Sequence, residues 1–201
     1  MAHMRADDRR RLFIDAAAKV VAEEGVARAT TRRITEVAGA PTASLHYVFE
    51  GKDALLRAVL EQGPIDGRLA GARFVPPGIG LSAGVEALMR GYLAWIVDDI
   101  GWQQAQFELM LWATRTPSAR HLPGQVYRSY LDHTVELLSA AAGEQRHAVD
   151  LSTLASQMLA ALDGLTLQAI AGQRSDLPTM VDRAIENLCC WLASSERESI
   201  G

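Results

Sequence analysis

Two short helical segments joined by a glycine turn, within residues 30–48, are the feature that most narrows what this chain can fold into. Thr30 is a residue type that caps helix N-termini, and apolar residues follow it at helical spacing. Gly39 permits a tight turn, and Pro41 suits the first turn of a second helix that we expect to end near Val48. Two helices this short, joined by so short a turn, are typical of a helix-turn-helix.

Apolar residues keep a helical period through the rest of the chain, and no segment alternates as strands do. We therefore expect an all-α protein of about nine helices. Eight of the eighteen residues between Gly63 and Gly80 are glycine or proline, which predicts a long connection there, with a short helical turn at 65–74 left open. The expected domains are a three-helix DNA-binding domain at 5–50 and a helical domain at 51–201. The other expected helices lie at about 7–24, 52–62, 82–97, 102–114, 117/123–142, 147–171 and from 176 onward.

Charge is unevenly divided along the chain, whose formal net charge is −4. Residues 1–62 hold ten basic and nine acidic side chains, and residues 63–201 hold ten and fifteen. This asymmetry is compatible with a small DNA-binding head on an acidic body, although it is too modest to establish one.

Several function classes find no support in the sequence. No apolar run approaches the ~18 residues of a membrane span, and the charged stretch 5–11 is unlike a secretory signal. The two cysteines are neighbours, Cys189 and Cys190, without the spacing of a zinc site. We expect reduced thiols, no cofactor, no metal, no membrane association and a cytoplasmic, nucleoid-associated location.

The helix-turn-helix segment resembles the DNA-binding region of the TetR family of transcriptional regulators, which typically reads T-x-R-x-I-A-x-x-A-G-V-S-x-G-x-L-Y-x-H-F-x-x-K-x-x-L. The resemblance is close over residues 7–62. Pro41, Ala43, His46 and Val48 depart from the pattern, and Val48 lacks the ring expected to contact a phosphate. The matching residues are Thr30, Arg32, Ile34, Ala38, Gly39, Leu45, Phe49, Lys52 and Leu55.

The resemblance implies that polar side chains of this segment contact DNA. Arg32 and Arg33 could instead be solvated surface charges, and His46 could pack at a hinge. Lys52 begins a helix, where the helix dipole disfavours a cation, and this favours a phosphate opposite it. The expected DNA contacts are Thr30, Arg32, Arg33, Thr42, Ala43, Ser44, His46, Tyr47 and Lys52.

Seven of the twelve aromatic residues fall between positions 92 and 130, where the resemblance implies an effector cavity. Any single ring could equally be ordinary core. Asp163 is the only charge between Leu151 and Gln173, and Asp163-Gly-Leu resembles an element of the choline-responsive branch of the family. Its role is left open between helix geometry, dimer contact and ligand anchor. The expected pocket residues are Tyr92, Trp95, Trp102, Phe107, Met110, Trp112, Tyr127, Tyr130 and Met158.

The last two expected helices carry small and apolar faces, and the resemblance implies that they form a four-helix bundle between two subunits. A symmetric dimer would also supply two heads for a pseudo-palindromic operator. The expected interface residues are Ala155, Leu159, Leu162, Ile185, Leu188 and Leu192.

These features together predict a ligand-responsive transcriptional regulator, not an enzyme. We expect a repressor, because a bound dimer blocks polymerase, and we expect a small, mostly apolar effector to release it. The alternative is a helical-bundle enzyme or binding protein without DNA function. Glu144 and His147 have the spacing of a di-iron ligand pair, but such a site needs two pairs and further glutamates.

Overall fold

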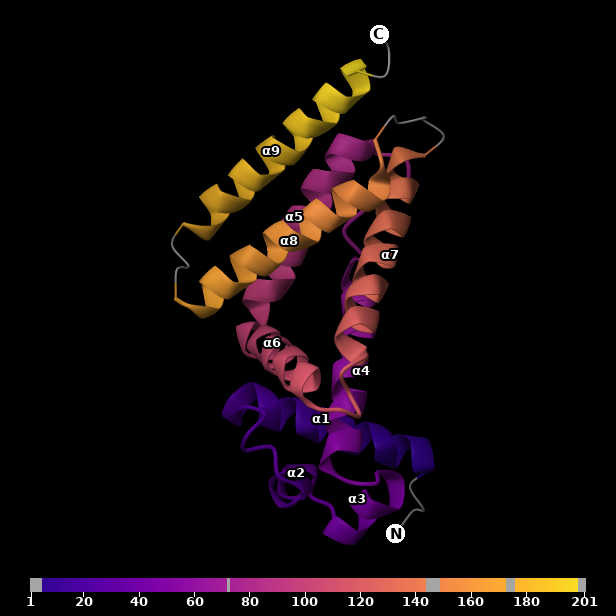
Figure 1. Cartoon of the computed structure of the whole chain (residues 1–201), viewed down its shortest axis with the longest axis vertical. Helices are drawn as coiled ribbons and strands as arrows, with labels where there is room; N and C mark the ends of the chain where they lie inside the picture. The colour runs from indigo at the N-terminus through magenta and orange to yellow at the C-terminus, as the bar shows by residue number, and fades with distance from the viewer. Residues whose placement is uncertain (1–4, 72, 144–148, 173–175, 199–201) are drawn as a thin grey trace. The chain divides into compact units, whose positions relative to one another are not determined.

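The chain is helical along almost all of the length that the structure describes (Figure 1). The computed structural model describes residues 5–71, 73–143, 149–172 and 176–198. Within these residues the all-α class is confirmed, and no described helix is both long and apolar enough to cross a membrane. The described residues form nine helices: α1 (Ala6–Glu24), α2 (Thr31–Ala38), α3 (Thr42–Val48), α4 (Lys52–Gly71), α5 (Leu81–Asp98), α6 (Ile100–Arg115), α7 (Leu122–Ala142), α8 (Leu151–Ile170) and α9 (Leu177–Glu198).

Two compact units make up the structure. Unit 1 comprises residues 1–63 and 101–126, and unit 2 comprises residues 64–100 and 127–201. Helix α6 thus belongs almost entirely to the unit that contains the N-terminal helices. The expected domain boundary between residues 50 and 51 leaves every expected DNA contact except Lys52 on its N-terminal side, and it remains a prediction.

Unit 1 is built on a core to which α1, α2, α3 and α4 each contribute side chains. Phe13, Ile34, Leu45 and Leu55 are fully buried, and α1 packs against both α2 and α3. Each large apolar side chain buried in this way stabilises the fold by about 1.5–3 kcal/mol. The core therefore sets the angle at which α3 stands on α1 and α2.

Local signals at the ends of α2 act as the sequence predicts. The Thr30 hydroxyl oxygen accepts a hydrogen bond from the Arg33 backbone N–H at 3.1 Å and so caps the helix. Gly39 ends α2 in the left-handed conformation, at φ 60° and ψ 30°. Pro41 then precedes α3 in extended conformation. The helix-turn-helix is confirmed.

Unit 2 has a separate core, in which α5 contacts both α8 and α9 and these two helices contact each other. Leu88 and Met89 of α5 and Leu154 of α8 are fully buried in it. Asp150 caps α8, because its carboxylate accepts hydrogen bonds from the backbone N–H groups of Ser152 and Thr153. The sequence predicted that this helix begins at about residue 147, whereas α8 begins at Leu151. Glu144 and His147, the expected surface pair, lie outside the described residues.

Helix α4 is longer than the sequence predicts. The prediction ended it at Gln62 because glycine and proline follow, whereas the structure continues it to Gly71. Tertiary packing explains the difference: a Cβ atom on Gly71 would lie 2.3 Å from the Tyr92 hydroxyl and 2.9 Å from Leu137. This glycine serves a close approach between elements rather than a loop, and packing outweighs its low helix propensity.

Candidate DNA-binding and effector sites

Helix α3 presents a polar face to solvent while Leu45 anchors it in the core. Thr42, Ala43 and His46 are exposed, and Ser44 is half-buried. His46 therefore has the exposure that a DNA contact needs and not the burial that a packed hinge residue would have. Tyr47 is 77% exposed, the most exposed large apolar side chain among the described residues. A ring with a hydroxyl held in solvent beside polar neighbours is suited to contact a phosphate backbone.

Two arginines of α1 lie over aromatic rings at the C-terminal end of α3, and neither was among the expected DNA contacts. The Arg9 guanidinium lies 5.9 Å from the ring centroid of Tyr47, and that of Arg10 lies 4.5 Å from the ring centroid of Phe49. Both distances are within the range of cation–π attraction. The run Arg9-Arg10-Arg11 was the signal in the sequence, but only the packing of α1 on α3 shows which surface it joins.

The two arginines of α2 differ in their partners. Arg32 has 88% of its side chain exposed and pairs with Glu36 on the same helix at 3.0 Å, a contact weak enough for DNA to displace. Arg33 donates to Glu24 of α1 at 2.6 Å and lies 3.6 Å from Glu36. The Glu24 hydrogen bond raises the pKa of Arg33. Arg33 thus braces α2 against α1, whereas Arg32 is available to a partner.

Hydroxyl groups link α2 to α3. The Thr35 hydroxyl donates to the Arg32 carbonyl at 2.9 Å, and its oxygen lies 3.3 Å from the hydroxyl oxygen of Thr42. Because the Thr35 proton is already directed to Arg32, Thr42 is the donor in this pair. Thr30 likewise uses its oxygen as a cap. Thr30 and Thr42, which are both predicted DNA contacts, therefore also have structural roles.

The turn after α1 is held from two sides. The Lys52 ammonium at the start of α4 donates to the Val26 carbonyl at 3.0 Å, and the Glu108 carboxylate of α6 accepts the Val26 backbone N–H at 2.9 Å. Lys52 thus has a protein partner that the sequence analysis did not foresee. An ammonium has three donors, so this bond does not prevent a phosphate contact, which stays a prediction.

The nine predicted pocket residues are divided between the two units. In unit 2, Tyr92 packs edge-on against Phe74 at 5.7 Å and Trp95 at 6.4 Å between ring centroids, and burial raises its pKa to about 12. Met158 is fully buried in the core of this unit. The other members are Tyr127 and Tyr130 in unit 2, and Trp102, Phe107, Met110 and Trp112 on α6 in unit 1.

Asp163 receives a hydrogen bond from the Tyr127 hydroxyl at 2.7 Å, within unit 2. Burial raises the pKa of the Asp163 carboxyl, and this hydrogen bond opposes the rise. The contact ties α8 to α7, which agrees with a structural role. The sequence showed the isolated carboxylate but could not show the tyrosine, thirty-six positions away.

Buried amide groups on α6 are a feature that the sequence analysis missed. Gln103 is 9% exposed, and its Nε2 atom is buried without a hydrogen-bond partner among the described residues. Nε2 and Oε1 of Gln106 are both buried as well, and neither has a hydrogen-bond partner in the part of the chain that the structure describes. Glutamine is mostly exposed in proteins, so the residue type did not indicate that Gln103 and Gln106 are buried. The only pattern in the sequence was their three-residue spacing, which places them on one helix face.

The predicted interface residues of α8 and α9 lie mostly inside the subunit. Ala155, Leu162, Ile185, Leu188 and Leu192 are buried in the core of unit 2, and Leu159 is half-buried. The structure therefore assigns five of these six side chains to the subunit's own core. The apolar face recognised in the sequence is the face that α5 and its neighbours cover.

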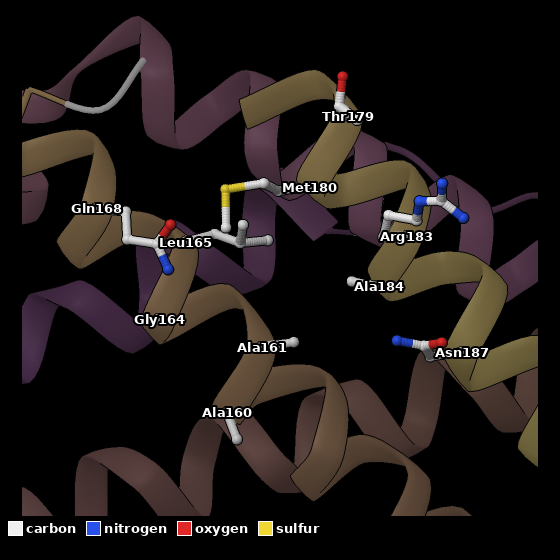
Figure 2. Close-up of a pocket in the computed structure, with 10 residues that line it drawn as sticks. All are labelled: Ala160, Ala161, Gly164, Leu165, Gln168, Thr179, Met180, Arg183, Ala184 and Asn187. Carbon is white, nitrogen blue, oxygen red and sulfur yellow. The ribbon is translucent and has the colours of Figure 1, made fainter. Parts of the chain in front are cut away.

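A different face of α8 and α9 forms a groove that is open to solvent. The groove has a volume of about 510 Å³ and lies between the two helices. Figure 2 shows the residues that line it. Most of its lining is small or apolar, with Gln168, Thr179, Arg183 and Asn187 adding polar groups. The remaining lining residues are Ala160, Ala161, Gly164, Leu165, Met180 and Ala184.

No group of three or more histidine, cysteine, aspartate or glutamate side chains is placed to hold a metal ion in the described parts of the chain.

Two family descriptions match the chain over most of its length. Residues 13–59 match the bacterial regulatory proteins of the tetR family, and residues 81–189 match the tetracyclin repressor-like C-terminal domain. The first match covers α2 and α3 with most of α1, and the second runs from the start of α5 into α9.

Individual relatives agree with this assignment. The nicotine-responsive transcriptional repressor HdnoR of Paenarthrobacter nicotinovorans is 33% identical over 173 residues, which are 82% of this chain and 84% of that protein. The multidrug binding protein EbrR, solved in complex with imidazole, is 27% identical with a TM-score of 0.65, over 94% of this chain and 93% of that one.

A regulator structure extends the likeness to nearly the whole fold. The putative transcriptional regulator from Pseudomonas aeruginosa PAO1 has a TM-score of 0.76 at 18% identity, over 98% of this chain and 96% of that one. Sequence, fold and the exposed face of α3 therefore agree: the chain belongs to the TetR family, and it is a ligand-responsive transcriptional regulator rather than an enzyme.

Proposed function

We propose that this regulator is a repressor, binds a pseudo-palindromic operator as a homodimer and is released by a small, mostly apolar effector. The observation that carries the DNA-binding part is the exposed face of α3. Tyr47 stands 77% exposed there, with the guanidinium of Arg9 beside its ring. Thr42 and Ser44 at the start of α3 are placed to contact base edges, while Tyr47, Arg9 and Lys52 contact phosphates.

Dimerisation is proposed through the open groove of α8 and α9. Its small side chains, among them Ala160, Gly164 and Ala184, allow helices of a second subunit to approach closely. A two-fold interface places the same groove of both subunits together. Arg183 and Asn187 at the groove would supply polar contacts at its rim. Two heads in a symmetric dimer match two half-sites about ten base pairs apart.

The proposed effector is a small aromatic or heterocyclic molecule. Two similar proteins support this class: HdnoR is nicotine-responsive, and EbrR was solved in complex with imidazole. Half-buried aromatic side chains are present in both units, Trp95 in unit 2 and Trp102 with Phe107 in unit 1. Such side chains are typical of sites for mostly apolar ligands. We also propose that the protein is cytoplasmic and associates with the nucleoid.

A mobility-shift assay tests this function. Purified protein is titrated onto DNA from upstream of its own gene and onto a scrambled sequence of equal length, at several salt concentrations. We expect preferential binding to the upstream DNA, weakening steeply with salt, and release by nicotine or a related heterocycle. Equal affinity for both sequences at every salt concentration would instead favour a helical binding protein without DNA function.

A further inference from the structure

Four residues of α6 share one helix face: Gln103, Gln106, Phe107 and Met110. Their spacing follows the turn of an α-helix, so the two amides stand one turn apart beside an aromatic ring and a thioether. Within residues 5–71, 73–143, 149–172 and 176–198, no group forms a hydrogen bond with the buried Gln103 Nε2 atom or with either polar atom of the buried Gln106 amide. This face thus combines apolar surface with unpaired polar groups, which is the composition of a ligand site.

Packing alone does not account for these amides. More than 90% of buried polar groups in proteins have a partner, because an unpaired one forfeits its hydrogen bond to water. Leucine or methionine would fill the same volume without that cost. An amide at such a position is therefore explained by a partner that is bound in only some states of the protein.

We propose that the Gln103 and Gln106 amides form the polar subsite for the effector, and that this subsite binds an uncharged group with a hydrogen-bond acceptor next to a donor. The inference rests on the proposed function and makes the effector class more specific. Two NH₂ groups one turn apart on the same face can both donate to an acceptor such as a carbonyl oxygen, and the Gln106 carbonyl oxygen can accept from an adjacent N–H or O–H. A lactam or a carboxamide has this pattern.

An uncharged group fits the electrostatics of this helix. Between Ile100 and Thr114 the only ionisable side chain on α6 is Glu108, and its carboxylate is already bound to the Val26 backbone N–H. An ion placed at the amides would lose water without gaining a counter-charge from α6, which is costly. Neutral amides without a partner gain hydrogen bonds from a neutral ligand, and no charge is buried.

The burial of the amides also links binding to a change in α6. Their atoms are closed to water in this structure, so a ligand reaches them only when the packing around α6 opens. Glu108 stands on the same helix and holds Val26, which connects α1 to α2. A ligand that favours the opened arrangement would therefore shift the population of helix-turn-helix positions.

Side-chain amide resonances of the full-length protein test the subsite directly. Nitrogen-15 spectra would be recorded with increasing valerolactam, which carries a carbonyl acceptor and an N–H donor in one ring, and with cyclohexane as the apolar control. The NH₂ signals are assigned by their loss in Gln103→Leu and Gln106→Leu. We expect valerolactam, and not cyclohexane, to shift both pairs while leaving Gln104, exposed on the same helix, unchanged. Unmoved Gln103 and Gln106 signals at saturating valerolactam, or equal shifts with cyclohexane, would overturn the proposal.

Thermal unfolding provides an independent measurement. Because each leucine removes an unpaired buried amide, Gln103→Leu and Gln106→Leu should each raise the melting temperature by about 2–4 °C. The matched control is Gln125→Leu, at an exposed position of unit 1, which should leave it unchanged. A fall in melting temperature for both α6 variants would show that their amides are hydrogen-bonded within the protein, and would overturn the proposal.

Operator binding separates this inference from the proposed function. Both α6 variants should bind the operator as wild type does, and both should lose at least tenfold in sensitivity to a lactam that releases the wild-type protein. Loss of operator preference in the wild-type protein itself would contradict the proposed function. Wild-type release that persists unchanged in both variants would contradict only the subsite.

Discussion

Replacing Glu108 by alanine is expected to loosen the turn between α1 and α2. The Glu108 carboxylate accepts the Val26 N–H at 2.9 Å in a partly buried position, and Gln104 donates to its other oxygen at 3.4 Å. A hydrogen bond to a charged group contributes about 1.5–3 kcal/mol, and the variant leaves the Val26 N–H without this acceptor. Alanine's better helix propensity offsets only a few tenths of a kcal/mol. We therefore expect a net loss of about 2 kcal/mol in the free energy of unfolding.

The assay is thermal unfolding together with operator titration. For a chain of this length, about 2 kcal/mol corresponds to a fall of roughly 4–8 °C in melting temperature. Operator affinity should fall as well, because the turn at Val26 precedes the helix-turn-helix directly. Glu108→Gln is the matched control, since it keeps an acceptor oxygen and loses only the charge, and it should recover about half of the stability.

A specific result would refute this reasoning. If Glu108→Ala melted within about 1 °C of wild type, the Val26 N–H would have to find another acceptor or water at no cost. The carboxylate would then be an ordinary surface charge. A loss of stability in Glu108→Gln as large as that in Glu108→Ala would assign the effect to charge and not to the hydrogen bond.

Three further predictions concern DNA binding, assembly and induction. Tyr47→Phe, which loses one hydroxyl, should weaken binding to all DNA sequences alike, whereas Thr42→Ala should change the base preference. Titration against a panel of half-sites distinguishes the two effects. If Thr42→Ala kept the wild-type base preference, the assignment of Thr42 as a base contact would be wrong. Ala160→Glu places a charge in the groove of α8 and α9 and should give monomers in sedimentation. The control Gln157→Glu, at an exposed position outside the groove lining, should remain a dimer. An intact Ala160→Glu dimer would place the interface elsewhere. Trp95→Ala should leave operator affinity nearly intact and blunt effector release, and the opposite pattern in mobility shifts would make this ring ordinary core.

The helical class and the helix-turn-helix were predictable because they depend on neighbours in sequence. A cap at Thr30, a left-handed glycine at Gly39 and apolar residues at helical spacing act within one or two turns of the chain. The ordered combination of these residues also carried the family resemblance. Local chemistry of this kind leaves its pattern in the sequence itself.

The sequence did not distinguish the groove of α8 and α9 from the apolar face that these helices bury in the core of unit 2. The hydrophobic periodicity showed that α8 and α9 each carry apolar and small residues. It did not show that Leu188 of α9 and Ala160 of α8 have different surroundings, because only the tertiary packing determines this. Leu188 is buried against the subunit's own core, whereas Ala160 lines the open groove. Which apolar side faces inward depends on helices far away in sequence, so hydrophobic pattern alone does not decide it.

What the sequence by itself determined is therefore the set of helices, the motif and the family. The tertiary structure alone decided how far α4 extends, which cations lie beside α3, and which polar groups are left unpaired. Gly71 continues a helix because it packs closely against Tyr92, and Arg10 lies over the ring of Phe49 because α1 packs against α3. The Gln106 amide is unusual because no described residue forms a hydrogen bond with its buried atoms. These properties arise from contacts between distant segments, whose geometry exists only once the chain has folded.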